Sequence, residues 1–445
     1  MIFNKKIVKI EFMNKKKKFY LMVFGCQMNH SDSERLASVL KKIGYKKTNK
    51  EEEADLIAVI ACSVRQSAVD RIHGKLRKWQ IIKEKKPLIT ILSGCVLEED
   101  RKKLAHKFDL FIDIKNLTNL ASDINKINPE EKLAFLPSFF EIKPNYESKY
   151  RAYVPIMTGC NKFCTYCAVP YTRGREVSRP SPEILLEIKE LLKKGYKEIV
   201  LLGQNVNSYG LDQEKEIKFP ELLQKIDKLN NKNWWLKFLT SHPYDLSDDL
   251  IKVMKNGKHI SKYLHLPVQS GSDTMLKKMN RHYTIKNYKK IINKVKKEIK
   301  NIAISTDIIV GFCGETKKQF KDTEKLMKDL KYNLAYLSQY SERSGTVAHK
   351  LHKDDISHKI KKERWNILNN IVKKNSLNFN KKLLNKKYEV LIDVINKKNK
   401  KYNNIGKLDN YITIHMTTNK PLKKGAFYKV KIIEAKPWGL KGMLI

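Results

Sequence analysis

Short apolar runs alternate with helical stretches along most of the chain, and this alternation constrains the fold more than any other feature. The first three runs are "FYLMVFG", "DLIAVIA" and "LITILSG". Continuous β-branched and aromatic residues are typical of strands buried on both faces of a parallel sheet. The sequence therefore predicts an α/β protein whose N-terminal domain, residues 19–143, is an open parallel sheet. Its first helix should begin near Ser31 or Asp32 and end before Gly44.

A cysteine follows each of these three runs, at Cys26, Cys62 and Cys95. The carboxyl ends of parallel strands share one edge of a sheet, and ligands bind at that edge. We therefore expect the three thiols to converge. The alternative is that they are small buried hydrophobic residues, because cysteine often has that role.

A second α/β region begins at Arg151. Six strand-like runs recur there, namely "RAYVPIM", "KEIVLLG", "WWLKFLT", "KYLHLPV", "IAISTDIIV" and "NLAYLSQY". Six units are too few for an eight-stranded barrel but fit an open partial (β/α)6 barrel, whose active site would lie at the carboxyl ends of its strands. We assign this domain to residues 144–378, after a weakly periodic, turn-rich stretch near 115–150.

The last part of the chain, residues 379–445, has short β-branched and aromatic runs separated by Gly, Asn and Lys turns. This pattern is typical of a small antiparallel β-barrel, and a long basic helical segment near 354–386 leads into it. Such barrels often bind nucleic acid. The alternative is a module that only stabilises its neighbour.

The formal net charge is +43, from 90 Lys and Arg against 47 Asp and Glu. This charge favours a polyanionic partner, because phosphate contacts release condensed counterions. Only 12 of the 90 basic residues are Arg, however, and such a ratio is also what A/T-rich codon drift produces. The placement of the arginines is more informative: Arg173, Arg175 and Arg179 follow a cysteine-rich loop, and Arg suits bidentate binding of phosphate or carboxylate.

No apolar run approaches the ~18 residues of a membrane helix, so we expect no membrane span and no membrane partner. The basic N-terminal extension, residues 1–18, lacks the apolar core of a secretory signal, and Met13 is a second candidate start. Seven cysteines in a chain of this length, three of them clustered, favour metal or redox chemistry in a reducing compartment over disulfides. We predict a cytoplasmic protein.

The clustered cysteines, Cys160, Cys164 and Cys167, have C-x3-C-x2-C spacing after the first barrel strand. A structural zinc site needs four ligands, and a ferredoxin-type cluster uses four thiolates. Three thiolates favour a 4Fe-4S cluster with one iron open to an exogenous ligand. By the same arithmetic, the three cysteines after the N-terminal strands predict a second 4Fe-4S cluster, which leaves Cys313 unassigned.

A C-x3-C-x2-C loop after the first strand of a partial barrel resembles the radical S-adenosylmethionine (SAM) enzymes. From about Phe19 onward the chain resembles one branch of them, the methylthiotransferases. The matching stretches are "GCQMNHSDSER", "ACSVRQSAVDRIHGKL", "SGCVLEE", "GCNKFCTYCAVPYTRGREVSRP", "LLGQNVNSYG", "TSHPYD", "LHLPVQSGSD", "MNRHYT", "DIIVGFCGETKKQF" and "YSERSGT". The C-terminal module resembles the RNA-binding TRAM domain. "GCQMN" and "TSHP" favour the tRNA-modifying branch of MiaB type over the ribosomal-protein branch, which more often has "GCPKN".

This resemblance implies transfer of a methylthio group to C2 of N6-isopentenyladenosine at position 37 of tRNA. S-adenosylmethionine would chelate the open iron at the loop, and an electron from the cluster would cleave it to methionine and a 5′-deoxyadenosyl radical, which removes the unreactive C2 hydrogen. The N-terminal cluster would carry the sulfur, methylated by a second S-adenosylmethionine. The implied partners are tRNA, whose anticodon loop can splay out adenosine 37, an electron donor, and a sulfur or cluster-assembly donor.

The resemblance also places cofactor-binding residues beside the six cluster cysteines. Those at the strand ends are Gly203, Gln204, Asn205, Ser241, His242, His265 and Gln269; Arg173 and Arg175 would bind cofactor carboxylate or substrate phosphate. An ordinary turn, a satisfied core histidine or a solvated arginine is the alternative for each.

Two positions depart from the family pattern: Cys313 and Ser344 stand where the family usually has proline. Neither change removes a proposed ligand, and Cys313 is either an oxidation-prone thiol or a small filler. The competing interpretations are the same chemistry on threonylcarbamoyl-adenosine in tRNA or on a ribosomal-protein aspartate, and a non-catalytic metal-containing RNA-binding protein.

Overall fold

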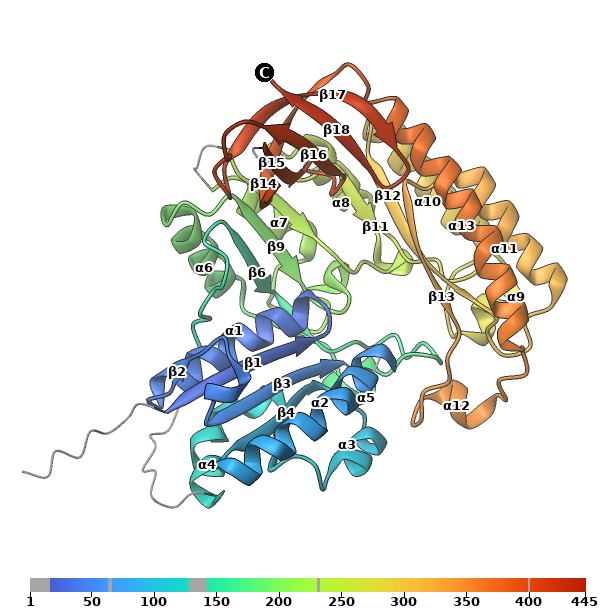
Figure 1. Cartoon of the computed structure of the whole chain (residues 1–445). Coiled ribbons are helices and arrows are strands. Elements are labelled where there is room, and N and C mark those ends of the chain that lie inside the picture. The colour runs from blue at the N-terminus through green and yellow to red at the C-terminus, as the bar shows by residue number, and fades with distance from the viewer. Residues whose placement is uncertain (1–16, 63–65, 128–141, 230–232, 399–400) are drawn as a thin grey trace, which may run out of the picture. The chain divides into compact units, whose positions relative to one another are not determined.

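The computed structural model describes residues 17–62, 66–127, 142–229, 233–398 and 401–445 (Figure 1). Most of the predicted basic extension therefore lies outside the described residues. The chain forms two compact units. One comprises Met1–Val96 and Asp100–Asn145, and the other comprises Leu97–Glu99 and Tyr146–Ile445. None of the described helices has the length and apolar character needed to cross a membrane.

The first unit is built on a five-stranded sheet with the order β2-β1-β3-β4-β5. All of its strand pairs are parallel, which confirms the predicted open parallel α/β fold. The strands are β1 (Lys18–Phe24), β2 (Lys46–Lys47), β3 (Leu56–Cys62), β4 (Ile89–Cys95) and β5 (Leu110–Phe111). This order is one of the common doubly wound topologies, and its ligand crevice lies between the first and third strands.

Helices cover both faces of this sheet. Successive side chains of a strand point to opposite faces. Accordingly, Leu56 and Ile60 of β3 pack into one apolar cluster with α1 and α4, while Ile57 and Val59 pack into a second cluster with α2. The helices are α1 (Gln27–Lys42), α2 (Gln66–Lys85), α3 (Glu98–Leu104) and α4 (Leu120–Ile127). Covering both faces explains why every residue of β3 is buried.

The first helix begins earlier than the sequence predicts. It starts at Gln27 with Cys26 as its N-cap residue, not near Ser31 or Asp32. Ser31 and Asp32 are the residue types that cap helices, but both are buried inside α1 and face the interior of the unit. Gly44 does follow the helix end, with a φ of +97° that favours glycine.

Six parallel strands form the partial barrel of the second unit, as predicted. They make two three-stranded sheets, β10-β9-β6 and β11-β12-β13, and a parallel bridge pairs Leu236 of β10 with Ile260, just before β11. The strands are β6 (Arg151–Pro155), β9 (Glu198–Leu202), β10 (Trp235–Phe238), β11 (Tyr263–His265), β12 (Ala303–Val310) and β13 (Leu334–Gln339). Each of the six predicted runs therefore supplies one strand.

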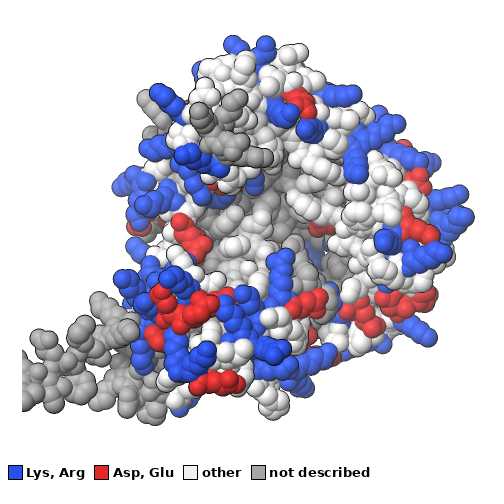
Figure 2. All heavy atoms as spheres, in the orientation of Figure 1, with Lys and Arg blue, Asp and Glu red and all other residues white. Residues whose placement is uncertain are grey.

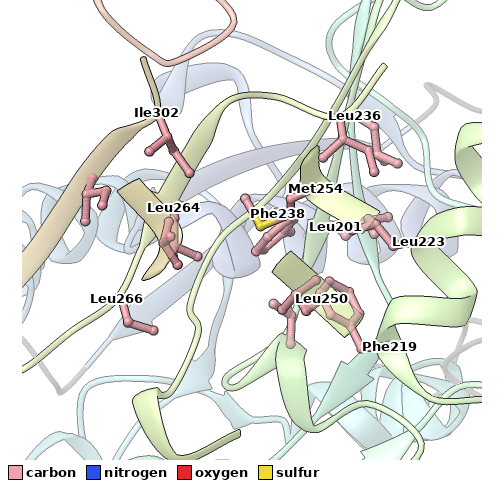
Figure 3. Packing of buried hydrophobic residues seen from close by; sticks show 14 of the residues in the cluster. Leu201, Phe219, Leu223, Leu236, Phe238, Leu250, Met254, Leu264, Leu266 and Ile302 are labelled. Carbon is pink, nitrogen blue, oxygen red and sulfur yellow. The ribbon is translucent and has the colours of Figure 1, made fainter. Parts of the chain in front are cut away.

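Helices between these strands enclose a large apolar core (Figure 3). Phe219 and Leu223 of α7 point toward Leu201 of β9 and Phe238 of β10, and the rings of Phe219 and Phe238 meet edge to face with centroids 5.2 Å apart. The helices of the unit are α5 (Val169–Arg173), α6 (Ser181–Lys193), α7 (Phe219–Asp227), α8 (Asp248–Asn256), α9 (Asp273–Lys278), α10 (Ile285–Glu298), α11 (Lys317–Leu330), α12 (Val347–Leu351) and α13 (His358–Lys381).

The C-terminal residues form a closed five-stranded β-barrel after the basic helix α13, as predicted. Its order is β14-β15-β16-β18-β17. The strands are β14 (Lys387–Lys398), β15 (Lys401–Lys407), β16 (Thr413–Thr418), β17 (Phe427–Lys436) and β18 (Gly439–Leu444). Its strand pairs are antiparallel except for β16 and β18, which pair in parallel where the barrel closes.

A buried group of charges joins this small barrel to the partial barrel. Glu198 on β9 binds both Arg151 and Lys237, with 2.7 Å between Lys237 Nζ and Glu198 Oε1. Lys237 also donates to the Leu408 carbonyl at 3.4 Å, and Arg151 binds Asp393 of β14 at 3.2 Å. Burial alone would raise the pKa of Glu198, but Lys237 and Arg151 hold that pKa below its ordinary value.

Basic side chains lie around much of the edge and over the lower part of the face drawn in Figure 2, with fewer acidic side chains among them, whereas residues of other kinds fill much of its middle. They are not gathered into a single stripe on that face. The net charge therefore does not by itself locate a nucleic-acid site, and the cysteine groups are the better starting point.

Candidate active site and metal centres

Cys160, Cys164 and Cys167 lie on one tight loop at the carboxyl end of the first barrel strand. The Cys160 amide donates to the Gly174 carbonyl at 3.1 Å, and the Cys167 amide donates to the Cys164 carbonyl at 2.9 Å. Cys164 is buried, and the other two are partly exposed. Local backbone turns thus present all three thiols within one short segment.

Glycine is required at the start of this loop. Gly159 has a φ of +82°, in the left-handed region that favours glycine. A Cβ at this position would lie 1.9 Å from the Arg175 carbonyl oxygen. The close backbone approach fixes where the cysteine loop leaves the strand.

Side chains from the next two strand ends anchor the loop. Lys162, between the first two cysteines, pairs with Asp245 at 2.7 Å, and the Asn205 side-chain amide donates to the same carboxylate at 2.7 Å. The Gln204 side-chain oxygen accepts from the Gly159 amide at 2.6 Å. Gln204 and Asn205, both predicted cofactor residues, therefore also hold the cysteine loop in place.

Burial keeps two of these thiols protonated at neutral pH in the cluster-free protein. It raises the pKa of Cys160 to about 11 and the pKa of Cys167 to about 12. The Val169 amide already donates to Cys167 Sγ at 3.4 Å. Metal ligation needs thiolates, so cluster binding must release protons from this loop.

Three buried polar atoms at the ends of β9 and β10 have no hydrogen-bond partner among the described residues: Asn205 Oδ1, Ser241 Oγ and His242 Nε2. His242 Nδ1 accepts from the Tyr244 amide at 3.2 Å, so Nε2 carries the ring proton and is a donor. Burial lowers the pKa of His242 to about 2, which keeps the ring neutral. Buried polar groups are nearly always paired. An acceptor and two donors side by side fit a ligand with amino, carboxylate and hydroxyl groups, as S-adenosylmethionine has.

The other predicted strand-end residues have partners within the protein. His265 Nδ1 shares a hydrogen bond with Ser305 Oγ at 2.8 Å, and its Nε2 lies 3.4 Å from Asp307. Gln269 is buried with a φ of +74°, and its backbone bonds to β12. The Gly203 carbonyl accepts from a neighbouring threonine hydroxyl at 2.7 Å. His265 and Gly203 thus have partners within the protein, and Gln269 is held through its backbone.

The two predicted arginines differ in exposure. Arg173 is 2% exposed, whereas Arg175 is exposed and its guanidinium lies 4.3 Å from the centroid of the Phe163 ring. Phe163 itself has a φ of +47°. Arg175 therefore stacks on the cysteine loop and presents its charge to solvent, where an anionic group can reach it.

Cys26, Cys62 and Cys95 come from three strand ends that the sheet makes neighbours. Cys62 and Cys95 are the last residues of β3 and β4 and are direct partners in the parallel register. Cys26 follows β1, which pairs with β3 on its other side. The three cysteines thus lie at the carboxyl ends of three adjacent strands, two of which, β1 and β3, border the crevice where doubly wound folds bind ligands.

A single buried side chain links these three strand ends. Asn29 is fully buried; its Oδ1 accepts from Cys26 Sγ at 3.2 Å, and its Nδ2 donates to the Ala61 carbonyl at 2.9 Å. A Cβ on Gly94, which has a φ of +101°, would lie 2.3 Å from that carbonyl and 3.0 Å from Asn29 Nδ2. Asn29 therefore fixes the spacing of the segments that carry all three cysteines.

Neither group is arranged as a site for a single metal ion. Within the described ranges, no three His, Cys, Asp or Glu side chains are placed to bind one ion. Such a site needs every thiolate about 2.3 Å from one point. A 4Fe-4S cluster sets a different requirement, because each thiolate binds a different iron. Three thiolates bound to such a cluster would leave one of its four irons without a protein ligand.

Cys313 and Ser344, the departures from the family pattern, lie outside both cysteine groups. Cys313 is 1% exposed, packs with Phe312 and Met279, and places Sγ 3.9 Å from the His352 carbonyl. Burial raises the pKa of its thiol. These contacts favour the interpretation of Cys313 as a small filler.

Sequence reasoning assigned no role to Asn29, Lys162, Asp245 or Arg281, all of which contact the cysteine segments. Each lies inside a quoted motif, so the residues themselves were visible. Their partners come from distant segments, and only the folded chain identifies them. For Asn29 and Lys162, a polar residue inside a cysteine motif is a signal that could have singled them out, whereas Asp245 and Arg281 lie in motifs without cysteine.

A six-stranded partial barrel with a three-cysteine loop after its first strand defines the radical SAM class of protein. The model of the radical SAM superfamily matches residues 154–327. The model described as uncharacterized protein family UPF0004 matches residues 18–113, which include the N-terminal cysteines.

Curated relatives match nearly the whole chain. A tRNA-2-methylthio-N(6)-dimethylallyladenosine synthase of Clostridium botulinum (strain Langeland) is 40% identical, covering 95% of this chain and 96% of the relative. The synthase of Clostridium tetani is 39% identical, covering 96% of this chain and 96% of the relative. The synthase of Thermoanaerobacter sp. (strain X514) is 40% identical, covering 96% of this chain and 92% of the relative. The chain belongs to the tRNA-2-methylthio-N(6)-dimethylallyladenosine synthase family.

Solved structures share the fold at low sequence identity. The radical SAM methyltransferase TsrM from Kitasatospora setae, with cobalamin and a 4Fe-4S cluster bound, has a TM-score of 0.54 at 13% identity, covering 75% of this chain and 77% of that one. The cobalamin-dependent radical SAM enzyme OxsB has a TM-score of 0.51 at 12% identity, and the match covers 80% of this chain and 56% of that one. These likenesses concern the fold alone.

Proposed function

We propose that this chain adds a methylthio group to C2 of N6-isopentenyladenosine, also called N6-dimethylallyladenosine, at position 37 of tRNA. The observation that carries the proposal is 40% identity to synthases of that name across 95% of the chain. The three-cysteine loop beside unpaired polar atoms at the barrel strand ends supports it. The base lies in a single-stranded loop, where it can be splayed out into a site.

In this proposal the loop cysteines hold a 4Fe-4S cluster beside the site for S-adenosylmethionine. When bound, the cluster and S-adenosylmethionine supply the radical chemistry that breaks an unreactive C–H bond. Ser241 and His242 would donate to the cofactor, and Asn205 Oδ1 would accept from it. Arg175 would bind an anionic group of the substrate from its exposed position on the loop.

We further propose that Cys26, Cys62 and Cys95 hold a second cluster that carries the sulfur. Their placement at the doubly wound crevice supports this role, as does the buried Asn29 that links their segments. The matching division of the chain is residues 19–143 for sulfur delivery, 144–378 for radical chemistry and 379–445 as a TRAM module.

The C-terminal barrel supplies RNA contacts in this proposal. Trp438, at the turn between β17 and β18, is 51% exposed, and the exposed Lys436 and Lys441, which both pair with Glu434, lie near the same turn. An exposed aromatic ring among lysines is suited to stacking on a base while the charges meet phosphates. A low-potential electron donor and a sulfur or cluster-assembly donor complete the set of partners.

Nucleoside mass spectrometry tests the proposed reaction. The anaerobically reconstituted chain is incubated with dithionite, S-adenosylmethionine and tRNA that carries N6-dimethylallyladenosine. The expected product is heavier by one SCH2 unit, because SCH3 replaces hydrogen. An unchanged nucleoside, alongside modification of tRNA that carries threonylcarbamoyl-adenosine, would reassign the substrate.

Iron and acid-labile sulfide measurements test the second cluster. The native chain should bind roughly eight irons, and a Cys160/Cys164/Cys167→Ala variant about four. About four in the native chain and none in the variant would make the N-terminal cysteines structural, and the sulfur-delivery proposal would fail.

A further inference from the structure

Arg281 is a buried cation whose guanidinium has no carboxylate partner among the described residues. It is 7% exposed and lies just after α9. Its Nη2 donates to the Pro267 carbonyl at 2.6 Å, its Nε donates to the Tyr283 hydroxyl at 2.8 Å, and its Nη1 donates to Cys164 Sγ at 3.5 Å. None of these acceptors is negatively charged while Cys164 is a thiol.

Removing a guanidinium from water without a counter-charge is costly, and such groups are almost always paired inside proteins. Two other buried arginines of this unit follow that rule. Arg364 binds Glu315 at 2.6 Å, and Arg179 binds Glu187 and, at 3.2 Å, Glu183. Arg281 differs from these two, and the partner that becomes an anion when iron binds is the Cys164 sulfur.

The position of Arg281 is fixed by the cysteine loop. The Thr165 amide and hydroxyl donate to the Met279 and Lys278 carbonyls at 3.1 and 3.0 Å. The Asn280 side-chain amide donates to the Phe163 carbonyl at 2.9 Å. Three bonds thus dock the segment that precedes Arg281 onto the loop, so the guanidinium has little freedom to move away from Cys164.

We propose that Arg281 is the counter-charge of the 4Fe-4S cluster held by the loop and that it raises the reduction potential of that cluster. Cys164 is a thiolate when it ligates iron, and reduction of the cluster by one electron adds a further negative charge. A fixed cation beside a ligating sulfur stabilises the reduced form more than the oxidised form. Cluster potentials depend on net charge and on hydrogen bonds to sulfur, and Arg281 supplies both.

The role is that of a positioning and tuning residue, because Arg281 acts through a ligand of the cluster. The electron itself would come from a low-potential one-electron donor, for which dithionite substitutes in the test below. The proposal rests on the proposed cluster at the loop, so iron content is measured first in every variant.

The test is a redox titration followed by electron paramagnetic resonance, in full-length chain with Cys26, Cys62 and Cys95 replaced by Ala. That background leaves a single cluster to titrate. Arg281→Met removes the charge, Arg281→Lys keeps it, and Tyr283→Phe removes the hydroxyl partner while leaving the guanidinium. Circular dichroism confirms that each variant is folded.

We expect Arg281→Met to lower the equilibrium constant for reduction of the cluster at least tenfold. For a one-electron step this makes the midpoint potential about 59 mV more negative. Arg281→Lys should shift it by less than half as much, and Tyr283→Phe should leave it unchanged. A cluster retained by Arg281→Lys but lost from Arg281→Met also supports the counter-charge, because Lys keeps the positive charge and its N–H donors whereas Met has neither.

Equal midpoints for Arg281→Met and the parent would overturn the proposal, and so would loss of the cluster from both Arg281 variants. In either case Arg281 would serve only to hold the Pro267 carbonyl. A parent chain without about four irons would instead contradict the proposed cluster at the loop.

Discussion

The two cysteine groups reach comparable arrangements by opposite routes. Cys160, Cys164 and Cys167 belong to one loop, whose own turns bring the thiols together. Cys26, Cys62 and Cys95 are distant in sequence and are brought together by strand register and by the buried Asn29. The difference teaches that three cysteines can be brought together by the turns of one short motif or by the register of a sheet. The second kind should fail whenever the sheet is disturbed.

The largest expected effect comes from changing the register of β4. Insertion of one alanine after Leu92 moves Cys95 out of register with Cys62 and turns the following side chains to the opposite face. The chain should fall from roughly eight irons to about four, with the loop cluster retained. Iron analysis and the radical SAM cluster's electron paramagnetic resonance signal measure this. An insertion that leaves all eight irons would show that the N-terminal group does not depend on register.

The next largest effect is expected from alanine substitutions at Gly94, beside the N-terminal cysteines, and at Gly159, at the start of the cysteine loop. A Cβ at Gly94 or Gly159 would lie 2.3 or 1.9 Å from a backbone oxygen, in addition to the cost of a positive φ. Each variant should lose iron from its own group only. Gly44→Ala and Gly195→Ala are matched controls, since both have positive φ but open surroundings.

The controls should lose only about 1–2 kcal/mol in the free energy of unfolding and keep all iron. Urea unfolding and iron content, measured together, separate backbone strain from the close approach. Equal iron loss in test and control variants would mean that strain alone explains the effect.

A smaller effect is expected from the two asparagines that anchor the groups. Asn29→Ala leaves the Ala61 carbonyl without its donor, and Asn280→Ala does the same to the Phe163 carbonyl. Each should cost about 1–3 kcal/mol in unfolding free energy, because a buried acceptor loses its partner. Asn29→Ala should also slow iron uptake by the N-terminal group. If Asn280→Ala lost iron from the loop cysteines faster than Asn29→Ala lost it from the N-terminal cysteines, the loop group would be the more easily disturbed of the two.

The smallest effect is expected at Arg175, which stacks on Phe163 at the exposed side of the loop. Arg175→Ala should reduce stability by about 0.5–1 kcal/mol, the usual worth of an exposed cation–π contact, and should leave iron content unchanged. Its effect on the KM for tRNA tests the proposed anion contact separately. A KM equal to that of the parent would confine Arg175 to a structural role.

Much of the fold followed from the sequence because its signals are local. The continuous apolar runs gave the strands, and the cysteine spacing marked the loop. Long-range features did not follow. Asn29 gains its importance from Ala61, 32 residues away, and Ser31 and Asp32 have the chemistry of capping residues although α1 buries them. The parallel pairing of β16 with β18 likewise depends on how the barrel closes, not on either strand alone.

The buried charges at the junction of the two barrels have a consequence for how the chain can be divided. Lys237 and Glu198 are at most 1% exposed, and Lys237 reaches the Leu408 carbonyl of the C-terminal barrel. A chain shortened to end at α13 would uncover these charges and remove Asp393 from Arg151. The C-terminal barrel is therefore not an independent module, because its removal would expose charges that the partial barrel keeps buried.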